Sequence, residues 1–98
     1  MLFRSTAPSG VTGGPVVGFD GSRWLVVWAE ASTPPTHDLR AVAVRDDGTV
    51  IDASPRLVAS NVLPATLAAA SAGDGRVLVV FGRPDGSSTA LRATLVTP

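Results

Sequence analysis

Trp24-Leu-Val-Val-Trp-Ala29 is the stretch that decides the fold of this chain. It is short, rich in β-branched and aromatic residues, and bounded by Asp20-Gly21 on one side and by Ser32–Thr36 on the other. These features favour a strand that is apolar on both faces, as expected in stacked sheets. Val77–Phe81 has the same character and also follows an Asp-Gly pair. The sequence therefore predicts an antiparallel all-β fold.

The chain repeats itself with a spacing of roughly 50 residues. Pro15–Trp28 aligns with Pro64–Phe81, and Leu39–Val44 aligns with Leu91–Val96. Self-similarity of this length predicts a repeat architecture of β units, in which each unit buries its face against a neighbour.

Each unit is predicted to contain a hairpin followed by a third strand. The expected strands are 16–19, 24–29 and 39–44 in the first unit and 65–70, 77–81 and 90–96 in the second. The alanine-rich run 65–70 has helix propensity, but Pro64 before it and Gly73 after it favour a strand. In the first unit a fourth strand is expected through Thr49–Asp52, with Arg56–Val58 as its continuation.

These elements divide the chain into three parts. Residues 1–14 form a leader, 15–60 the first blade-like unit, and 61–98 a second unit that lacks its last strand. Met1–Thr6 precedes Pro15 as Arg56–Ser60 precedes Pro64, so the leader is expected to supply an outer strand of a preceding unit.

The two units resemble bacterial, often exported, β-propeller-like repeats, whose pattern is close to Pro-x-Val-Ala-x-Asp-Gly-x-x-Tyr-Leu-Val-Val-Trp. The matching residues are Pro15, Val17, Asp20, Gly21, Trp24, Leu25, Val26, Val27 and Trp28, followed by Val42, Val44, Asp47 and Gly48. The second unit matches at Pro64, Asp74, Gly75, Leu78, Val79 and Val80, with Phe81 in place of the Trp. The resemblance covers residues 12–98 and implies four-stranded antiparallel blades and a secreted or cell-surface protein. Propellers close with about four to eight blades, so the chain is expected to be a fragment, to assemble from several copies, or to pack as a small sandwich.

Composition restricts the partners. The 98 residues are 45% apolar and 16% charged, which excludes a polar disordered chain. A formal net charge of zero gives no field to attract nucleic acid or an anionic membrane, and it removes the repulsion that opposes self-association. The absence of cysteine excludes disulfides and thiolate metal sites. No apolar run approaches the roughly 20 residues of a membrane span, and residues 1–8 lack the core of a secretory signal.

Four Asp-Gly pairs, at Asp20, Asp47, Asp74 and Asp85, are predicted to form hairpin turns, because both residue types tolerate the backbone of a tight turn. The alternative is a calcium site at Asp46, Asp47 and Asp52. It lacks the ligand spacing of a known calcium loop, so no metal site and no cofactor are predicted.

Five other residues are candidates for binding: Trp24, Trp28, His37, Arg40 and Arg92. Trp24 and Trp28 share one face of a strand, where packing is favoured over a ligand platform. His37, the only histidine, is expected in a solvent-exposed loop and has no partners for nucleophilic catalysis or zinc. Arg40 and Arg92 recur in Leu-Arg-Ala and are expected to line a polar face or to pair with Glu30 or Asp38.

These features predict a non-catalytic structural or interaction module. Its partners are further copies or the remaining blades of a longer protein. The alternatives are a propeller that binds a glycan or peptide through loops 32–38 and 84–88 and, with less support because Glu30 is the only glutamate, a propeller hydrolase.

Overall fold

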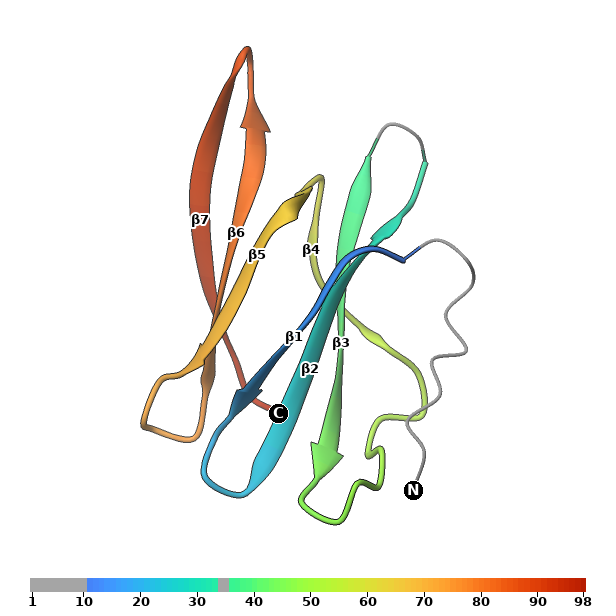
Figure 1. The fold of residues 1–98 in the computed structure, drawn as a ribbon, viewed down its shortest axis with the longest axis vertical. Helices are drawn as coiled ribbons and strands as arrows, with labels where there is room; N and C mark the ends of the chain where they lie inside the picture. The colour runs from blue at the N-terminus through green and yellow to red at the C-terminus, as the bar shows by residue number, and fades with distance from the viewer. Residues whose placement is uncertain (1–10, 34–35) are drawn as a thin grey trace.

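The computed structural model describes residues 11–33 and 36–98 and is built entirely of antiparallel sheets (Figure 1). The first sheet has four strands in sequence order: β1 (Val11–Phe19), β2 (Arg23–Ala31), β3 (His37–Arg45) and β4 (Arg56–Ser60). The second has three, also in sequence order: β5 (Leu63–Ser71), β6 (Val77–Asp85) and β7 (Ser88–Val96). The predicted all-β, antiparallel fold is confirmed.

Short Asp-Gly turns join β1 to β2, β5 to β6 and β6 to β7, and a fourth follows β3. The glycine of each Asp-Gly pair has a positive φ, as the hairpin prediction requires. At the first turn the Asp20 carboxylate accepts hydrogen bonds from the backbone N–H groups of Ser22 and Arg23, both at 2.7 Å. The β6–β7 hairpin projects past the amino-terminal end of β5 (Figure 1).

Two expected strands differ from those observed. β1 begins at Val11 and so includes the last four residues of the leader, whereas the strand expected at Met1–Thr6 lies outside the described residues. Thr49–Asp52 is not a strand. Val50 makes only an isolated bridge to Val44. The pairing does not continue because the next N–H of β3, on Ala43, donates to the side-chain Oδ2 of Asp52 at 2.6 Å. Regular pairing with β3 resumes at Arg56.

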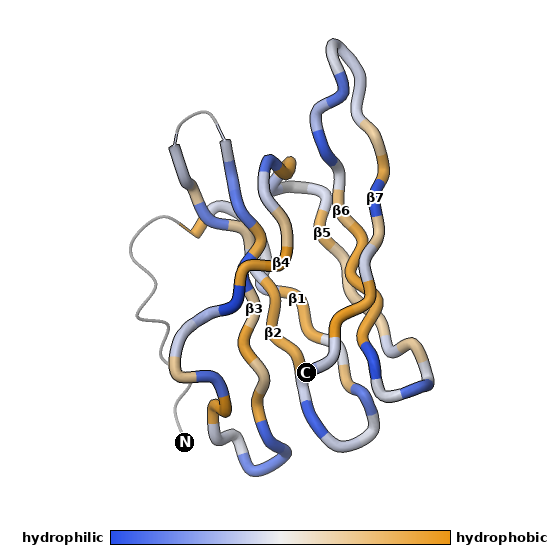
Figure 2. Tube along the Cα trace, turned by 180° about the vertical axis from the view of Figure 1, so that it is seen from behind, coloured by the Kyte–Doolittle hydropathy of each residue, from blue (hydrophilic) through white to orange (hydrophobic). Residues whose placement is uncertain are grey.

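The core lies between the two sheets. Its buried members from the first sheet are Leu25, Val27, Ala29, Leu39 and Ala41, and those from the second are Val77, Val79 and Phe81, with Val62 between the sheets in sequence. Because side chains alternate along a strand, Trp24, Val26 and Trp28 lie on the other face of β2. There Trp28 packs with Val42 and Val44 in a second, smaller cluster. Figure 2 shows the hydrophobic stretches along the middle of the strands and hydrophilic residues mainly at the turns.

The sheets approach most closely along their first strands, β1 and β5, which lie side by side (Figure 1). Glycines make this approach possible. A Cβ on Gly13 would lie 2.0 Å from the carbonyl oxygen of Pro64, and one on Gly18 would lie 2.3 Å from Cγ1 of Val77. A larger residue at Gly13 would have to displace the backbone of Pro64, and one at Gly18 would have to displace the side chain of Val77.

The carboxyl end of the chain also ties the second sheet to the first. Arg56 Nη1 donates to the Thr97 carbonyl at 2.7 Å, and Arg23 Nη1 donates to the Pro98 carbonyl at 3.3 Å. Pro98 is buried. Arg83 adds a contact near the opposite end, where its Nη2 donates to the Ser60 carbonyl at 2.9 Å.

Candidate functional site

A row of polar side chains crosses the outer face of the first sheet next to the buried Trp28. The indole nitrogen of Trp28 donates to Glu30 Oε1 at 3.1 Å, and Arg40 Nε lies 4.0 Å from the same oxygen. Arg40 Nη2 also lies 3.6 Å from Asp38 Oδ2. The cross-strand register explains the row, because Glu30 pairs with Asp38 and Trp28 pairs with Arg40. The expected pairing of Arg40 with Glu30 or Asp38 is confirmed, whereas no ion pair among the described residues involves Arg92.

The chemistry open to this row is limited by its own contacts. Glu30 and Asp38 both lie against Arg40, so the two carboxylates share one neutralising cation. The side chains of Arg40, Glu30 and Asp38 are 32%, 19% and 16% exposed, so ligand access is partial. Such an arrangement stabilises two adjacent strands and satisfies the indole N–H of Trp28.

The sequence predicts that His37 lies in a solvent-exposed loop, and this prediction is wrong. The histidine is the first residue of β3, is half-buried, and pairs with Ala31 of β2. Its backbone carbonyl accepts a hydrogen bond from Val62 at 3.0 Å, and its Nδ1 lies 3.1 Å from Thr12 Oγ1. The β2–β3 pairing continues to the end of the connecting loop and therefore includes the histidine.

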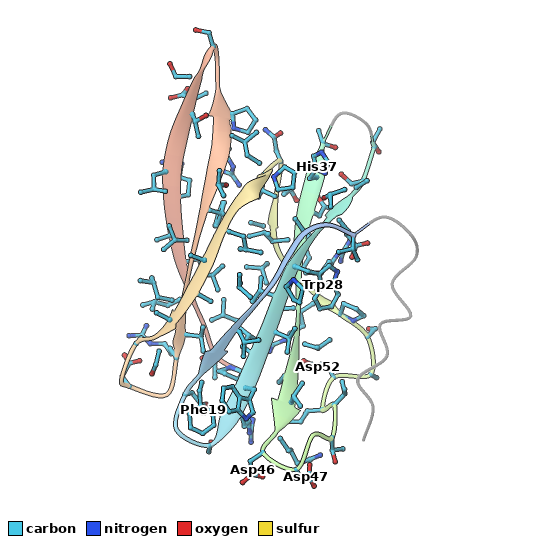
Figure 3. All side chains as sticks on the ribbon, in the orientation of Figure 1. Phe19, Trp28, His37, Asp46, Asp47 and Asp52 are labelled. Atoms are coloured by element: carbon cyan, nitrogen blue, oxygen red, sulfur yellow. The ribbon has the colours of Figure 1, made fainter. Side chains whose placement is uncertain are left out.

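The remaining candidates do not join the row. Trp24 lies on the same face as Trp28 but at the turn end of β2, 40% exposed, with its ring 4.5 Å from that of Phe19. Arg92 is exposed on β7 of the second sheet, opposite Phe81. The five residues thus belong to different faces of two sheets and form no single site (Figure 3 labels Phe19, Trp28 and His37).

The acidic cluster that suggested calcium is dispersed. Asp46 and Asp47 lie at the turn after β3, whereas Asp52 lies beside the strand, away from that turn (Figure 3). Asp47 Oδ1 accepts the Thr49 N–H at 2.9 Å, and Asp52 lies 3.4 Å from Arg56. Within the part of the chain that the structure describes, no group of three or more His, Asp or Glu side chains is placed to hold a metal ion.

Three aspartates and one arginine at turns have shifted pKa values. The hydrogen bond from the Arg23 backbone N–H, followed by that from Ser22, lowers the pKa of Asp20 below its ordinary value. The Thr49 side chain and backbone likewise lower the pKa of Asp47. The hydrogen-bonded pair of Asp74 and Arg76 lowers the pKa of the carboxyl and raises that of the guanidinium. These shifts stabilise turns and do not prepare an acid or base for catalysis.

The most distinctive surface is an apolar one that no candidate residue marked. We call it the leucine face, the outer face of the second sheet, formed by Ala68, Ala70, Leu78, Val80, Leu91, Ala93 and Leu95. Leu91 is 75% exposed and Leu95 is 44% exposed. The alternation of apolar residues in β7, read together with its alignment to β3, is the sequence signal that could have identified this face.

The chain matches no known protein family, no curated protein and no solved structure. In the described residues no helix has the length and hydrophobicity needed to cross a membrane. The fold and its surfaces are therefore the basis for assigning a function.

Proposed function

We propose that the chain is a non-catalytic structural or interaction module, formed by two consecutive β-propeller-like blades that act through the faces of their sheets. One observation carries this proposal: the sheets pack through unlike faces. Val27 of the first sheet lies in the same buried cluster as Val79 of the second. In the alignment of the units Val79 corresponds to Val26, which lies on the opposite face of the first sheet. The back of one unit thus packs on the front of the other.

Packing of this kind supports an array of blades over a sandwich. A sandwich of two related sheets that packs like face on like face is complete, because both apolar faces are used. Front-to-back packing leaves apolar residues exposed on both outer faces, Leu91 and Leu95 on the second sheet and Val17 and Trp24 at the turn end of the first, where further units can add. Propellers close such an array at about four to eight blades, so this proposal gives the chain external neighbours.

The pairing within each unit supports the same interpretation. Leu39 of β3 pairs with Ala29 of β2, and the aligned Leu91 of β7 pairs with Gly82 of β6. The aligned segments therefore have the same register in both sheets. The close approach of β1 and β5 also fits blades that converge on a common axis along one strand each.

The polar groups support a structural role over a catalytic one. Glu30 and Asp38 are paired with Arg40, and Asp52 is engaged by a backbone N–H and by Arg56. A hydrolase needs a carboxylate or nucleophile directed at a bound substrate, whereas these carboxylates are directed at arginines and at a backbone N–H.

Two assays on the purified chain test this proposal in parallel: a screen for hydrolase activity and a glycan-binding array. Glu30→Gln and Arg40→Gln serve as matched variants, and circular dichroism verifies their folding. We expect no turnover and no saturable glycan binding from the wild type. Turnover abolished by Glu30→Gln would replace the module with a hydrolase, and glycan binding abolished by Arg40→Gln would replace it with a lectin.

A further inference from the structure

We infer that the leucine face binds the outer face of the first sheet of a second copy, so that chains assemble front to back. This inference rests on the blade packing proposed above and adds the partner. The surface that receives the leucine face is the tryptophan end, which we define as Val17, Phe19 and Trp24 of the first sheet. All three residues lie on the outer face of that sheet, because Val17 pairs with Val26 and Phe19 pairs with Trp24.

The leucine face consists of positions that this chain already buries elsewhere. Leu78, Val80, Leu91 and Ala93 align with Leu25, Val27, Leu39 and Ala41 of the first sheet. Those four first-sheet residues are between 0% and 1% exposed and form the core against the second sheet. Their counterparts on the second sheet have no partner sheet among the described residues, and Leu91 is 75% exposed. An apolar face of this kind on a soluble protein marks an interaction site.

The tryptophan end is the exposed part of the complementary face. Val17 is 48% exposed and Trp24 is 40% exposed, whereas Trp28, Val42 and Val44 farther along the same face are buried. In the alignment Trp24 corresponds to Val77, one of the second-sheet residues that contact the first sheet. The tryptophan end of the first unit therefore corresponds to the part of the second unit that packs on the first sheet inside the chain.

The intramolecular contact also specifies which residues meet between copies. Within the chain, Gly18 of β1 leaves space for Val77. Gly18 pairs with Leu25, and Ala70 pairs with the aligned Leu78, so Ala70 is the counterpart of Gly18. The same packing between copies places Ala70 of one chain against Trp24 of the next. In both contacts a small residue on the first strand faces a larger residue on the neighbouring sheet.

A second copy is the occupant that these observations favour. The leucine face needs a partner with the side chains of the tryptophan end, and every copy carries one. The formal net charge of zero means that copies do not repel one another. The contact is heterologous, because the two surfaces differ, and such contacts form rings when the rotation closes and open chains when it does not.

The test uses two variants that each remove one surface. Leu91→Glu introduces a charge on the leucine face, and Val17→Glu introduces the same charge at the tryptophan end. Both positions are exposed, so neither change should unfold the chain. Ser87→Glu, at the exposed tip of the β6–β7 hairpin, is the control for added charge. Circular dichroism and thermal melting verify the fold, and Trp24→Glu is a second variant of the tryptophan end.

Light scattering on a size-exclusion column gives the mass of each sample. We expect wild type and Ser87→Glu to exceed the 10.0 kDa of one chain and both surface variants to fall to it. An equimolar mixture of the two variants retains one intact pair of surfaces, so it should form a complex of about twice the mass of one chain. A monomeric wild type would overturn the inference. So would loss of assembly only in Leu91→Glu, since this would mean that two leucine faces bind each other.

Failure of this inference is distinguishable from failure of the proposed function. The blade packing inside the chain is tested separately with Gly18→Cys and Val77→Cys, whose Cβ atoms would lie 3.3 Å apart, slightly below the usual range for a disulfide. The chain has no other cysteine. A disulfide in this double variant, together with a monomeric wild type, would retain the module and reject the second copy as its partner.

Discussion

The contact between Gly18 and Val77 gives the strongest prediction for stability. Gly18 has an ordinary negative φ, so alanine is compatible with its backbone, but the new Cβ would lie 2.3 Å from Cγ1 and 3.1 Å from Cγ2 of Val77. Val77 is fully buried, so a shift of its side chain must displace neighbouring core residues. Overpacking of this kind costs about 1–3 kcal/mol, and the lower entropy of the unfolded chain returns about 0.4–1 kcal/mol. We therefore expect Gly18→Ala to lower the free energy of unfolding by up to about 2.6 kcal/mol, with about 1.3 kcal/mol at the middle of these ranges.

Urea unfolding followed by circular dichroism measures this change, and a double-mutant cycle assigns its cause. Val77→Ala alone removes buried methyl groups and should cost about 2 kcal/mol. In Gly18→Ala/Val77→Ala the clash is gone, so the double variant should be more stable than the sum of the single changes predicts, by about 1 kcal/mol or more. Ala31→Val, at an exposed strand position, is the control and should change stability by less than about 0.5 kcal/mol. A neutral Gly18→Ala with additive energies would refute the close packing of β1 against the second sheet.

The remaining predictions concern the aligned leucines and the turns. Leu39→Ala should lower the free energy of unfolding by about 2–5 kcal/mol, because Leu39 is only 1% exposed. Leu91→Ala, at a residue that is 75% exposed, should lower it by less than about 0.5 kcal/mol in the monomeric state. Equal losses in urea unfolding would contradict the assigned faces. Asp20→Ala should lower the melting temperature more than Asp20→Asn does, because the amide oxygen can still accept the two backbone N–H groups; the opposite order would show that charge dominates the turn. In the folded protein the pKa values of Asp20, Asp47 and Asp74 lie below their ordinary value. These carboxylates therefore stabilise the fold above the ordinary pKa, and the stabilisation is lost as the pH falls through the folded pKa values. Melting temperatures measured from pH 7 to pH 2 should decline below about pH 4, and a rise there would contradict the shifts.

The strands of this fold could be predicted from local sequence, since each depends on side chains within a few residues. Val77–Phe81 is apolar, β-branched and flanked by turn residues, and it falls within β6. The strand expected at Thr49–Asp52 was wrong because backbone pairing with β3 stops at Ile51. The next N–H of β3, on Ala43, donates to the Asp52 carboxylate, a contact that no propensity describes. The prediction that His37 lies in a loop was wrong for a related reason. The pairing of β2 with β3 extends to Ala31 and His37, so the histidine belongs to the strand.

The candidate site was less predictable, because its parts depend on the register and on how the sheets stack. The pairing of Arg40 with Glu30 and Asp38 could be expected from neighbouring strands, and the structure confirms it. The leucine face could not be found from β6 alone, since Val77–Phe81 is apolar on both faces and nothing within it shows which face the first sheet covers. The stacking settles this question, and it depends on Gly18 and Val77, residues that are far apart in the sequence.

The front-to-back packing of the two sheets is the central claim, and nuclear Overhauser contacts between methyl groups test it most directly. We expect contacts from Leu25 and Val27 to Val79 and the ring of Phe81, and from the Gly18 Hα protons to the Val77 methyls. Contacts from Leu25 and Val27 to Leu78 and Val80 would mean that like faces pack, as in a closed sandwich. That result would contradict the blade packing, the open leucine face and the assembly inferred from them.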